Sequence, residues 1–498
     1  MAKKAIPMRI ERAVSPNQRA NMNSFAKILT AVAIVLLGFY IYSLDLFSDN
    51  PPQTKVYLYI NPTKPPVPID DTSVWNTSRQ IAIFAQSASG IKSYTVKART
   101  KGGLTVVDTK EVLNDKPKKL KIWLPKPDVS LPDKTTVDYE ICITDWSNAN
   151  LFSGSTTKKN LQLTINSKQP VITIISHSNK ISYGGSALVV FHIDSIDIGE
   201  LSISNGVQEF IPFPFMKDGY YAALIAWSIA SKNFSASISV RDSGYNAHKM
   251  VVPFIRDNYP RYSKSTITLK EDFLNNKLDS LISDIGRSFP ADMEDNFEKF
   301  QYINETIRNQ DDEIISAKLQ EAMNARAILL SQKPSWENFT PLKGYSTVGR
   351  FGDARTYIAP DGQTSQSVHL GIDMASVKND KIILSNEGKI ALSRQLGVYG
   401  KTILVEHSFG LVTLYSHLQE LQKDENEVVK KGDILGLTGQ SGWAFGDHLH
   451  FGVLVGGVPV RVSEWLDSKW IKNNITDIFE NAALSIQRQG ENPMNLEQ

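Results

Sequence analysis

The sequence predicts a mostly β, multidomain protein with one membrane-spanning helix near its N-terminus. Three observations lead to this fold class. A chain of 498 residues is too long for one compact core and corresponds to about three domains. A single long apolar run lies close to the N-terminus. Short β-rich runs separated by Gly, Pro, Asn and Asp follow it, and such a pattern is typical of antiparallel sheets.

The composition excludes several classes of protein. Hydrophobic residues make up 41% and charged residues 21% of the chain, which is ordinary for folded globular domains. Lys and Arg number 54 against 52 Asp and Glu, so the basic excess of a nucleic-acid-binding protein is missing. We therefore expect no nucleic-acid partner. The only cysteine, Cys142, cannot form an intramolecular disulfide, which excludes a disulfide-stapled scaffold.

Residues 25–44 are predicted to form a single-pass membrane anchor. The stretch Ile28–Leu44 carries no charge, and a helix of that length approaches the thickness of the hydrocarbon core. The preceding residues, 1–24, hold mostly basic charges, which predicts a cytoplasmic tail and export of everything after the anchor. A cleaved signal peptide and a buried core helix are the alternatives. The apolar run is long for a signal peptide, and Tyr42-Ser43-Leu44-Asp45 offers no small-x-small cleavage site.

Two stretches of similar pattern are predicted to be immunoglobulin-like β-sandwich modules. The run Gln80–Ala85 is matched by Ala187–His192, and polar turns after alternating strands begin at Asp145 and Asp242. These aspartates lie 97 residues apart, close to the roughly 100 residues of one such sandwich. The predicted modules cover residues 52–166 and 168–257. We favour a rigid spacer as their role over the recruitment of partners.

A helical linker is predicted for residues 266–332. Leu, Ile and Phe recur there at the three- and four-residue steps of amphipathic helices, and Pro290 interrupts them. No metal or acid–base cluster stands out in this segment. Whether the linker covers a downstream active site stays open. At the other end of the chain, residues 471–498 are predicted to form a helix and a tail, with the last dozen residues frayed.

The chemistry-bearing residues gather in a predicted domain of residues 340–470. Five of the eight histidines lie there. Four of them stand in the fragments His369-Leu-Gly-Ile-Asp373, Leu414-Tyr-Ser-His417 and His448-Leu-His450, and the fifth is His407. The first fragment contains Gly371 and is expected to be a loop that runs into a strand. Residues i and i+2 of a strand point to the same face, so His448 and His450 are expected to project into one site. Two histidines and one carboxylate supply the three protein ligands that a catalytic zinc site uses, and two histidines remain for proton transfer.

This part of the chain resembles the lysostaphin/LytM-type zinc endopeptidases of bacterial cell walls. The resemblance extends from about Gly344 to Trp470. It rests on the fragments above together with Gly349–Tyr357, Gly400–Leu411 and Gly432–Gly439. The resemblance implies a compact antiparallel β domain with a groove for a peptide strand.

The resemblance also assigns roles to the five residues of the site. It implies that His369, Asp373 and His450 bind Zn²⁺ and that His417 and His448 form the catalytic pair beside the metal. The remaining histidine of this domain, His407, lies in a turn-like setting and is expected to be structural.

The resemblance and the predicted anchor together imply a function. We expect a zinc metalloendopeptidase of the bacterial inner (cytoplasmic) membrane, with its C-terminal domains in the periplasm or outside the cell. Peptidoglycan stem peptides or cross-links are the expected substrate, and D,D-endopeptidase activity is the expected specificity, with a glycyl-glycine bond as the Gram-positive alternative. The β modules could contact cell-wall or division proteins. The alternative functions are a non-catalytic LytM-like module that activates a partner amidase and a structural scaffold.

Overall fold

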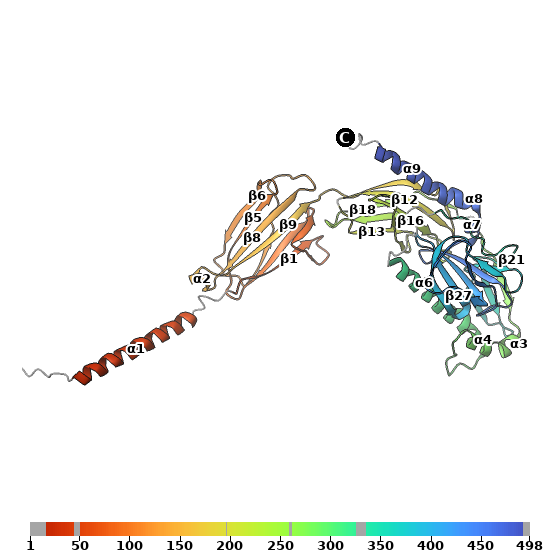
Figure 1. The fold of residues 1–498 in the computed structure, drawn as a ribbon, viewed down its shortest axis with the longest axis horizontal. Helices are drawn as coiled ribbons and strands as arrows, with labels where there is room; N and C mark the ends of the chain where they lie inside the picture. Colours follow the sequence, from red (N-terminus) through yellow and green to blue (C-terminus); the bar gives the residue numbers. More distant parts are fainter. Residues whose placement is uncertain (1–15, 44–49, 196, 258–260, 325–334, 492–498) are drawn as a thin grey trace, which may run out of the picture. The chain divides into compact units, whose positions relative to one another are not determined.

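The protein is described by a computed structural model, which covers residues 16–43, 50–195, 197–257, 261–324 and 335–491. The chain divides into two compact units, residues 1–168 with 243–245 and residues 169–242 with 246–498. Each unit is described on its own. Both are dominated by strands, and an apolar helix lies near the N-terminus, so the mostly β prediction is confirmed (Figure 1).

Helix α1 (Pro16–Ser43) contains the apolar run. Its segment Phe25–Ser43 has a mean hydropathy of 2.0 and is long and apolar enough to cross a membrane. None of this segment is buried inside the structure, so it is not a core helix. Most of the predicted basic tail, residues 1–15, lies outside the described residues.

The first unit buries one core between two sheets (Figure 1). Their strand orders are β2-β1-β4-β7 and β3-β9-β8-β5-β6. Inward-facing residues alternate with outward-facing ones, as in β8, whose core side includes Ile141 and Ile143. One edge pair, β3 with β9, is parallel rather than antiparallel, because the two strands are far apart in the sequence and no tight turn joins them. The elements are β1 (Gln53–Tyr59), β2 (Val67–Pro68), β3 (Thr72–Trp75), β4 (Gln80–Gln86), β5 (Ile91–Thr100), β6 (Thr105–Val112), β7 (Lys119–Trp123), β8 (Thr136–Asp145), α2 (Ala149–Phe152) and β9 (Thr156–Ile165).

The second unit begins with another β region, residues 169–257 without 243–245. Its sheets have the orders β10-β12-β16-β15 and β14-β13-β17-β18, and a parallel pair, β11 with β19, stands beside them. The strands are β10 (Val171–His177), β11 (Lys180–Ser182), β12 (Ser186–Asp194), β13 (Glu200–Ser204), β14 (Glu209–Phe210), β15 (Phe213–Pro214), β16 (Tyr220–Ala226), β17 (Ser237–Arg241), β18 (Ala247–Val251) and β19 (Ile255–Asp257). The immunoglobulin-like topology of both regions stays a prediction.

The predicted linker is part of the second unit. It opens with a strand, β20 (Lys264–Thr268), which pairs in parallel with β22 of the C-terminal domain. Helices follow it: α3 (Glu271–Asn276), α4 (Leu278–Asp284), α5 (Asn296–Gln301), the π-helical turn η1 (Tyr302–Ile307) and α6 (Arg308–Asn324). Their apolar residues share one buried cluster with side chains from β26, β27 and β28. We call residues 264–324 the helical segment from here on; it packs on the C-terminal domain as a covering layer.

The C-terminal domain, residues 340–470, is built on an antiparallel sheet of eight strands. Its order is β21-β24-β32-β28-β27-β26-β30, with β33 paired to β32, and a smaller sheet has the order β25-β31-β29. The elements are β21 (Ser346–Gly349), β22 (Ala354–Ile358), β23 (Thr364–Val368), β24 (Ile372–Ala375), β25 (Lys381–Ile383), β26 (Gly388–Leu396), η2 (Gly397–Tyr399), β27 (Gly400–Glu406), β28 (Leu411–Leu418), β29 (Glu420–Leu421), β30 (Val428–Val429), β31 (Ile434–Leu437), β32 (Leu449–Val455), β33 (Val458–Pro459), α7 (Val462–Leu466) and α8 (Ser468–Ile471).

The second β region and the C-terminal domain share one continuous hydrophobic core. The rings of Phe213 and Phe409 lie 5.6 Å apart, and the Trp465 indole donates a hydrogen bond of 3.1 Å to Ser186. A shared core of this kind favours one rigid body. The sequence pattern did not indicate that these two regions share a core.

The chain ends in the π-helical turn η3 (Lys472–Thr476) and helix α9 (Asp477–Glu491). The apolar face of α9, including Phe479 and Ala482, is buried in the shared core. The expectation of a frayed last dozen residues is therefore wrong up to Glu491, because this face anchors the helix. Residues 492–498 lie outside the described part of the chain.

The buried carboxylate of Glu464 lies at this junction and makes the free energy of unfolding depend on pH. Burial raises the pKa of Glu464 from 4.5 to about 7, although the Ser186 amide donates to it at 3.3 Å. The stabilisation from this group is complete below pH 4.5 and is lost as the pH rises through 7. We expect Glu464→Gln to raise the free energy of unfolding at pH 8 by as much as about 3 kcal/mol and to leave it unchanged at pH 4.5.

Urea unfolding of the full chain in detergent at both pH values measures this difference. Glu480→Gln, at an exposed position of α9, is the matched control and should show no pH-dependent gain. A gain of the same size at both pH values would contradict the assignment to Glu464.

Candidate metal centre

The register of two neighbouring strands brings Asp373 and His450 together. β24 and β32 are antiparallel, and these two residues are direct partners across the pair. Side chains of direct partners lie on the same face of a sheet. His369 precedes β24 in an irregular segment and reaches the same point, as expected for a loop that runs into a strand.

Three donor atoms converge at this point. The Nε2 atom of His369 lies 3.0 Å from Asp373 Oδ1 and 3.0 Å from His450 Nδ1, and His450 Nδ1 lies 2.9 Å from the same carboxylate oxygen. These three residues form a candidate metal cluster within the described part of the chain. The two histidines are at least nine-tenths buried.

The hydrogen bonds around His369 test whether a cation fits this cluster. Its Nδ1 lies 2.9 Å from the carbonyl oxygen of Arg350, which can only accept, so Nδ1 carries the proton. The Nε2 of a neutral His369 then presents a lone pair toward Asp373 and His450. When the proton of His450 is on Nε2, three lone pairs face one another, and they repel unless a cation lies between them. Two imidazole nitrogens and one carboxylate oxygen are a donor set that zinc accepts.

The carboxylate of Asp373 is held in its charged form. Burial raises its pKa, but the close contacts with the His369 and His450 imidazoles outweigh burial and hold the pKa well below the ordinary value. Arg355 lies 3.7 Å from the other carboxylate oxygen, Oδ2. Oδ1 is therefore left for the cluster. Arg355 has the position of an outer partner that orients a metal ligand, here Asp373. Burial lowers the pKa of His450 to about 4, so its imidazole is neutral at physiological pH.

Two further histidines face the cluster. His417 Nδ1 donates to the Ser441 carbonyl at 2.8 Å and His448 Nδ1 donates to the Gly446 carbonyl at 2.8 Å. Each Nε2 is thereby left with a lone pair for proton transfer. The two rings lie 4.9 Å apart, and His448 Nε2 lies 3.7 Å from Asp373 Oδ1.

His417 is held in an unusual state. Burial, together with the neighbouring His448, lowers its pKa to about 3, so the ring is neutral. Its backbone has φ = +63°, in the left-handed region that non-glycine residues rarely adopt. Strained backbone of this kind is concentrated at functional sites.

His407 lies apart from the cluster. Its Nδ1 donates to the Glu387 carbonyl at 2.8 Å, and its Nε2 lies 2.7 Å from the Thr413 hydroxyl. Burial lowers its pKa to about 4. Both ring nitrogens are occupied within the domain, which fits the structural role expected from the sequence.

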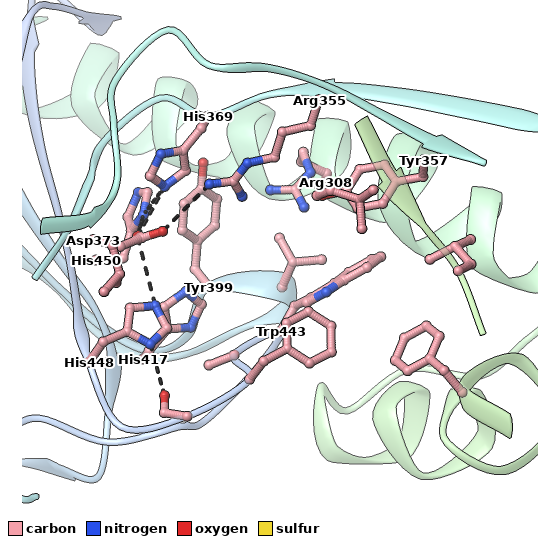
Figure 2. A pocket seen from close by; sticks show the side chains of 18 of the residues that line it. Arg308, Arg355, Tyr357, His369, Asp373, Tyr399, His417, Trp443, His448 and His450 are labelled. Carbon is pink, nitrogen blue, oxygen red and sulfur yellow. Dashed lines mark hydrogen bonds and ion pairs between the residues drawn. The ribbon is translucent and has the colours of Figure 1, made fainter. Parts of the chain in front are cut away.

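The cluster opens into a pocket of about 660 Å³ (Figure 2). All five predicted site residues line it. Aromatic side chains from the C-terminal domain form much of its wall, including Tyr357, Tyr399 and Trp443. A pocket of this size that joins apolar walls to a few convergent polar groups is typical of a ligand site.

The opposite wall of the pocket comes from the helical segment, which sequence analysis did not connect to the site. β20 and the residues after it contribute Leu269, Lys270 and Phe273. α5 is joined to the site through Phe300, whose ring lies 5.4 Å from that of Trp443. Arg308 at the start of α6 completes the wall.

Residues 367–462 match the model of peptidase family M23. The C-terminal domain belongs to peptidase family M23. This confirms the resemblance to the lysostaphin/LytM-type metallopeptidases. The matched residues of the M23 domain include all six histidine and aspartate residues that line the pocket, and they exclude Arg355, Tyr357 and the whole helical segment.

Several known proteins are similar to the M23 domain. The DD-carboxypeptidase/endopeptidase Mpg of Neisseria meningitidis is 33% identical over 94 residues, which are 19% of this chain and 22% of that protein. The peptidoglycan DD-endopeptidase ShyB of Vibrio cholerae is 27% identical over 142 residues, 28% of this chain and 30% of that protein. The chain thus spans less than a third of either relative. A solved M23 peptidase from Pseudomonas aeruginosa, 17% identical, covers 58% of this chain and 96% of its own, with a TM-score of 0.36.

Proposed function

We propose that the chain is a membrane-anchored zinc endopeptidase that hydrolyses peptide cross-links of peptidoglycan. The observation that carries the proposal is the set of five donor groups in one pocket. Three of them, His369, Asp373 and His450, turn donor atoms toward a common point, and the imidazoles of His417 and His448 keep a free Nε2 beside it.

The cluster would hold the zinc ion, which supplies Lewis acidity that polarises the scissile carbonyl and lowers the pKa of the attacking water. The residues of the chain handle the protons. Nε2 of His417 or His448 accepts a proton from the attacking water, and the other imidazole, when its Nε2 is protonated, donates a hydrogen bond to the oxyanion that develops. The water oxygen bonds to the carbonyl carbon, the C–N bond breaks, and the proton passes to the amine that leaves.

The substrate is inferred from family and relatives together. Relatives of the M23 domain carry the names peptidoglycan DD-endopeptidase and DD-carboxypeptidase/endopeptidase. A D,D-bond in the cross-link between stem peptides is therefore the proposed target. The aromatic side chains that line the pocket can pack against a few residues of a peptide.

The anchor and β regions complete the proposal. Phe25–Ser43 crosses the bacterial cytoplasmic membrane, and the remainder of the chain works outside it, next to the cell wall. The first unit acts as a spacer or as a surface for cell-wall or division proteins. The non-catalytic amidase activator is disfavoured, because the donor set is complete; such a module does not need free imidazole nitrogens beside a metal cluster.

Digestion of purified sacculi tests this proposal. Sacculi are incubated with the full chain in detergent, with zinc, and the muropeptides are identified by mass spectrometry. We expect cross-linked dimers to be converted to monomers by cleavage at the D,D-bond. The His369→Ala variant is the matched control and should leave the dimers intact. Unchanged dimers after treatment with folded, zinc-loaded protein would contradict the proposal, as would equal cleavage by the control.

A further inference from the structure

The wall contributed by the helical segment is cationic. Lys270 and Arg308 line it, and neither is among the residues matched by the M23 model. Two carboxylates also line the pocket, but each of them already has other partners. Asp373 belongs to the metal cluster, and Asp447 accepts hydrogen bonds from Thr438 at 2.6 Å and from the Asn379 amide at 3.1 Å. The wall therefore presents positive charge that the pocket itself does not balance.

Arg308 has no ionic partner among the residues that the structure describes. Its Nε donates to the Asn304 carbonyl at 3.1 Å, and its guanidinium carbon lies 5.6 Å from the centre of the Trp443 ring. The terminal nitrogens remain for a ligand in the pocket, into which the side chain points (Figure 2). A half-buried guanidinium with two free donors is suited to a bidentate carboxylate.

Hydrogen bonds on both sides of Arg308 fix its position. One turn earlier, Asn304 donates to the Ser365 hydroxyl at 2.9 Å. One turn later, Asp311 accepts from the Val398 amide at 2.7 Å and Asp312 accepts from the Tyr399 hydroxyl at 2.7 Å. Positions three and four residues apart share one helix face, so these contacts clamp the face that carries Arg308. The helical segment is therefore a preorganised wall.

We propose that Arg308 is a specificity-determining residue that binds a free carboxylate of the substrate peptide, next to the bond that is cleaved. The pocket is too small for more than a few peptide residues, so a carboxylate on Arg308 belongs to a residue close to the scissile amide. The substrate class is thus a peptide whose leaving-group residue carries a free carboxylate. This inference rests on the proposed function and sharpens it.

A pair of synthetic cross-link peptides tests the inference. D-alanine is joined to an amine of diaminopimelate, and the carboxylate beside that amide is either free or converted to a carboxamide. The wild-type full chain should prefer the free carboxylate by about 10- to 100-fold in kcat/KM, as expected for a charge-assisted hydrogen bond. In Arg308→Gln the preference should fall to within about threefold, and Arg308→Lys should restore part of it.

Two controls separate recognition from stability. Arg394→Gln, at an exposed position of β26, should keep the wild-type preference. Burial raises the pKa values of Asp311 and Asp312, and the nearby charge of Arg308 opposes that rise, so thermal unfolding is measured for every variant. Equal loss of activity on both peptides together with a lower melting temperature would show a structural role and overturn the inference. A preference that survives in Arg308→Gln, or a wild type without one, would also overturn it.

Binding of the same peptides distinguishes this inference from the proposed function. Calorimetry on the zinc-loaded His417→Asn chain measures their dissociation constants without turnover. If the wild type cleaves neither peptide, the proposed function fails. A tighter carboxylate complex that depends on Arg308 would still support the binding site, and equal affinities would overturn it.

Discussion

Replacement of His450 by alanine is expected to abolish metal binding and turnover together. Its Nδ1 is one of three donor atoms that lie about 3 Å apart, at 3.0 Å from His369 Nε2 and 2.9 Å from Asp373 Oδ1. Two donors cannot form a tetrahedral site with only one open position. The loss of zinc affinity should exceed the roughly 10- to 100-fold that follows removal of an outer partner. Zinc per chain after desalting, measured by mass spectrometry, reports it.

A histidine outside the cluster provides the control for this variant. His248 lies in β18, where its Nδ1 is 2.8 Å from the Pro170 carbonyl. His248→Ala should keep one zinc per chain and full turnover. Stoichiometric zinc in His450→Ala would show that the ion is held elsewhere.

Replacement of His417 should separate the two effects: the chain keeps its zinc, and turnover falls by about 10²- to 10⁴-fold. Its ring is not one of the three cluster donors, and its Nδ1 is committed to the Ser441 carbonyl at 2.8 Å. What is lost is the free Nε2 that accepts or donates a proton. The measurement pairs zinc content with the initial rate of cross-link cleavage.

The backbone of His417 decides which substitution is informative. At φ = +63° alanine is strained, whereas asparagine tolerates the left-handed region well. His417→Asn therefore removes the imidazole with little change in backbone strain. If His417→Asn retained full turnover while His417→Ala lost it, the defect would come from the backbone and the catalytic role would be wrong.

Residue spacing and family resemblance together were sufficient to predict which histidines and which aspartate line the pocket. In His448-Leu-His450 the period of two places both rings on one face, whatever the rest of the fold does. The H-x-x-x-D fragment was interpreted as a loop that enters a strand, and β24 begins at Ile372 within it. The antiparallel C-terminal domain followed from the same fragments through family resemblance.

The wall of the pocket could not be predicted because it depends on tertiary packing. Arg308 lies about sixty residues before the first metal ligand, in a segment that is predicted to be helical and to hold no metal or acid–base cluster. Its position at the site depends on tertiary contacts such as that of Asp312 with Tyr399, which no local sequence pattern predicts. The parallel pairing of β20 with β22 is equally non-local.

The shared core escaped prediction for a related reason. Alternating strands indicate that a buried face exists, but not what covers it. The β region of residues 169–257 was expected to close on itself, whereas α9 and the C-terminal domain complete its core.

The central claim is that a zinc ion held by His369, Asp373 and His450 drives cleavage of peptidoglycan cross-links. The most direct measurement is a zinc titration of the metal-stripped full chain against a purified cross-linked muropeptide dimer. We predict no cleavage without zinc and a rate that rises until one zinc per chain is bound, with no response in Asp373→Ala. Cleavage by the metal-free chain, or the same zinc response in Asp373→Ala, would contradict the claim.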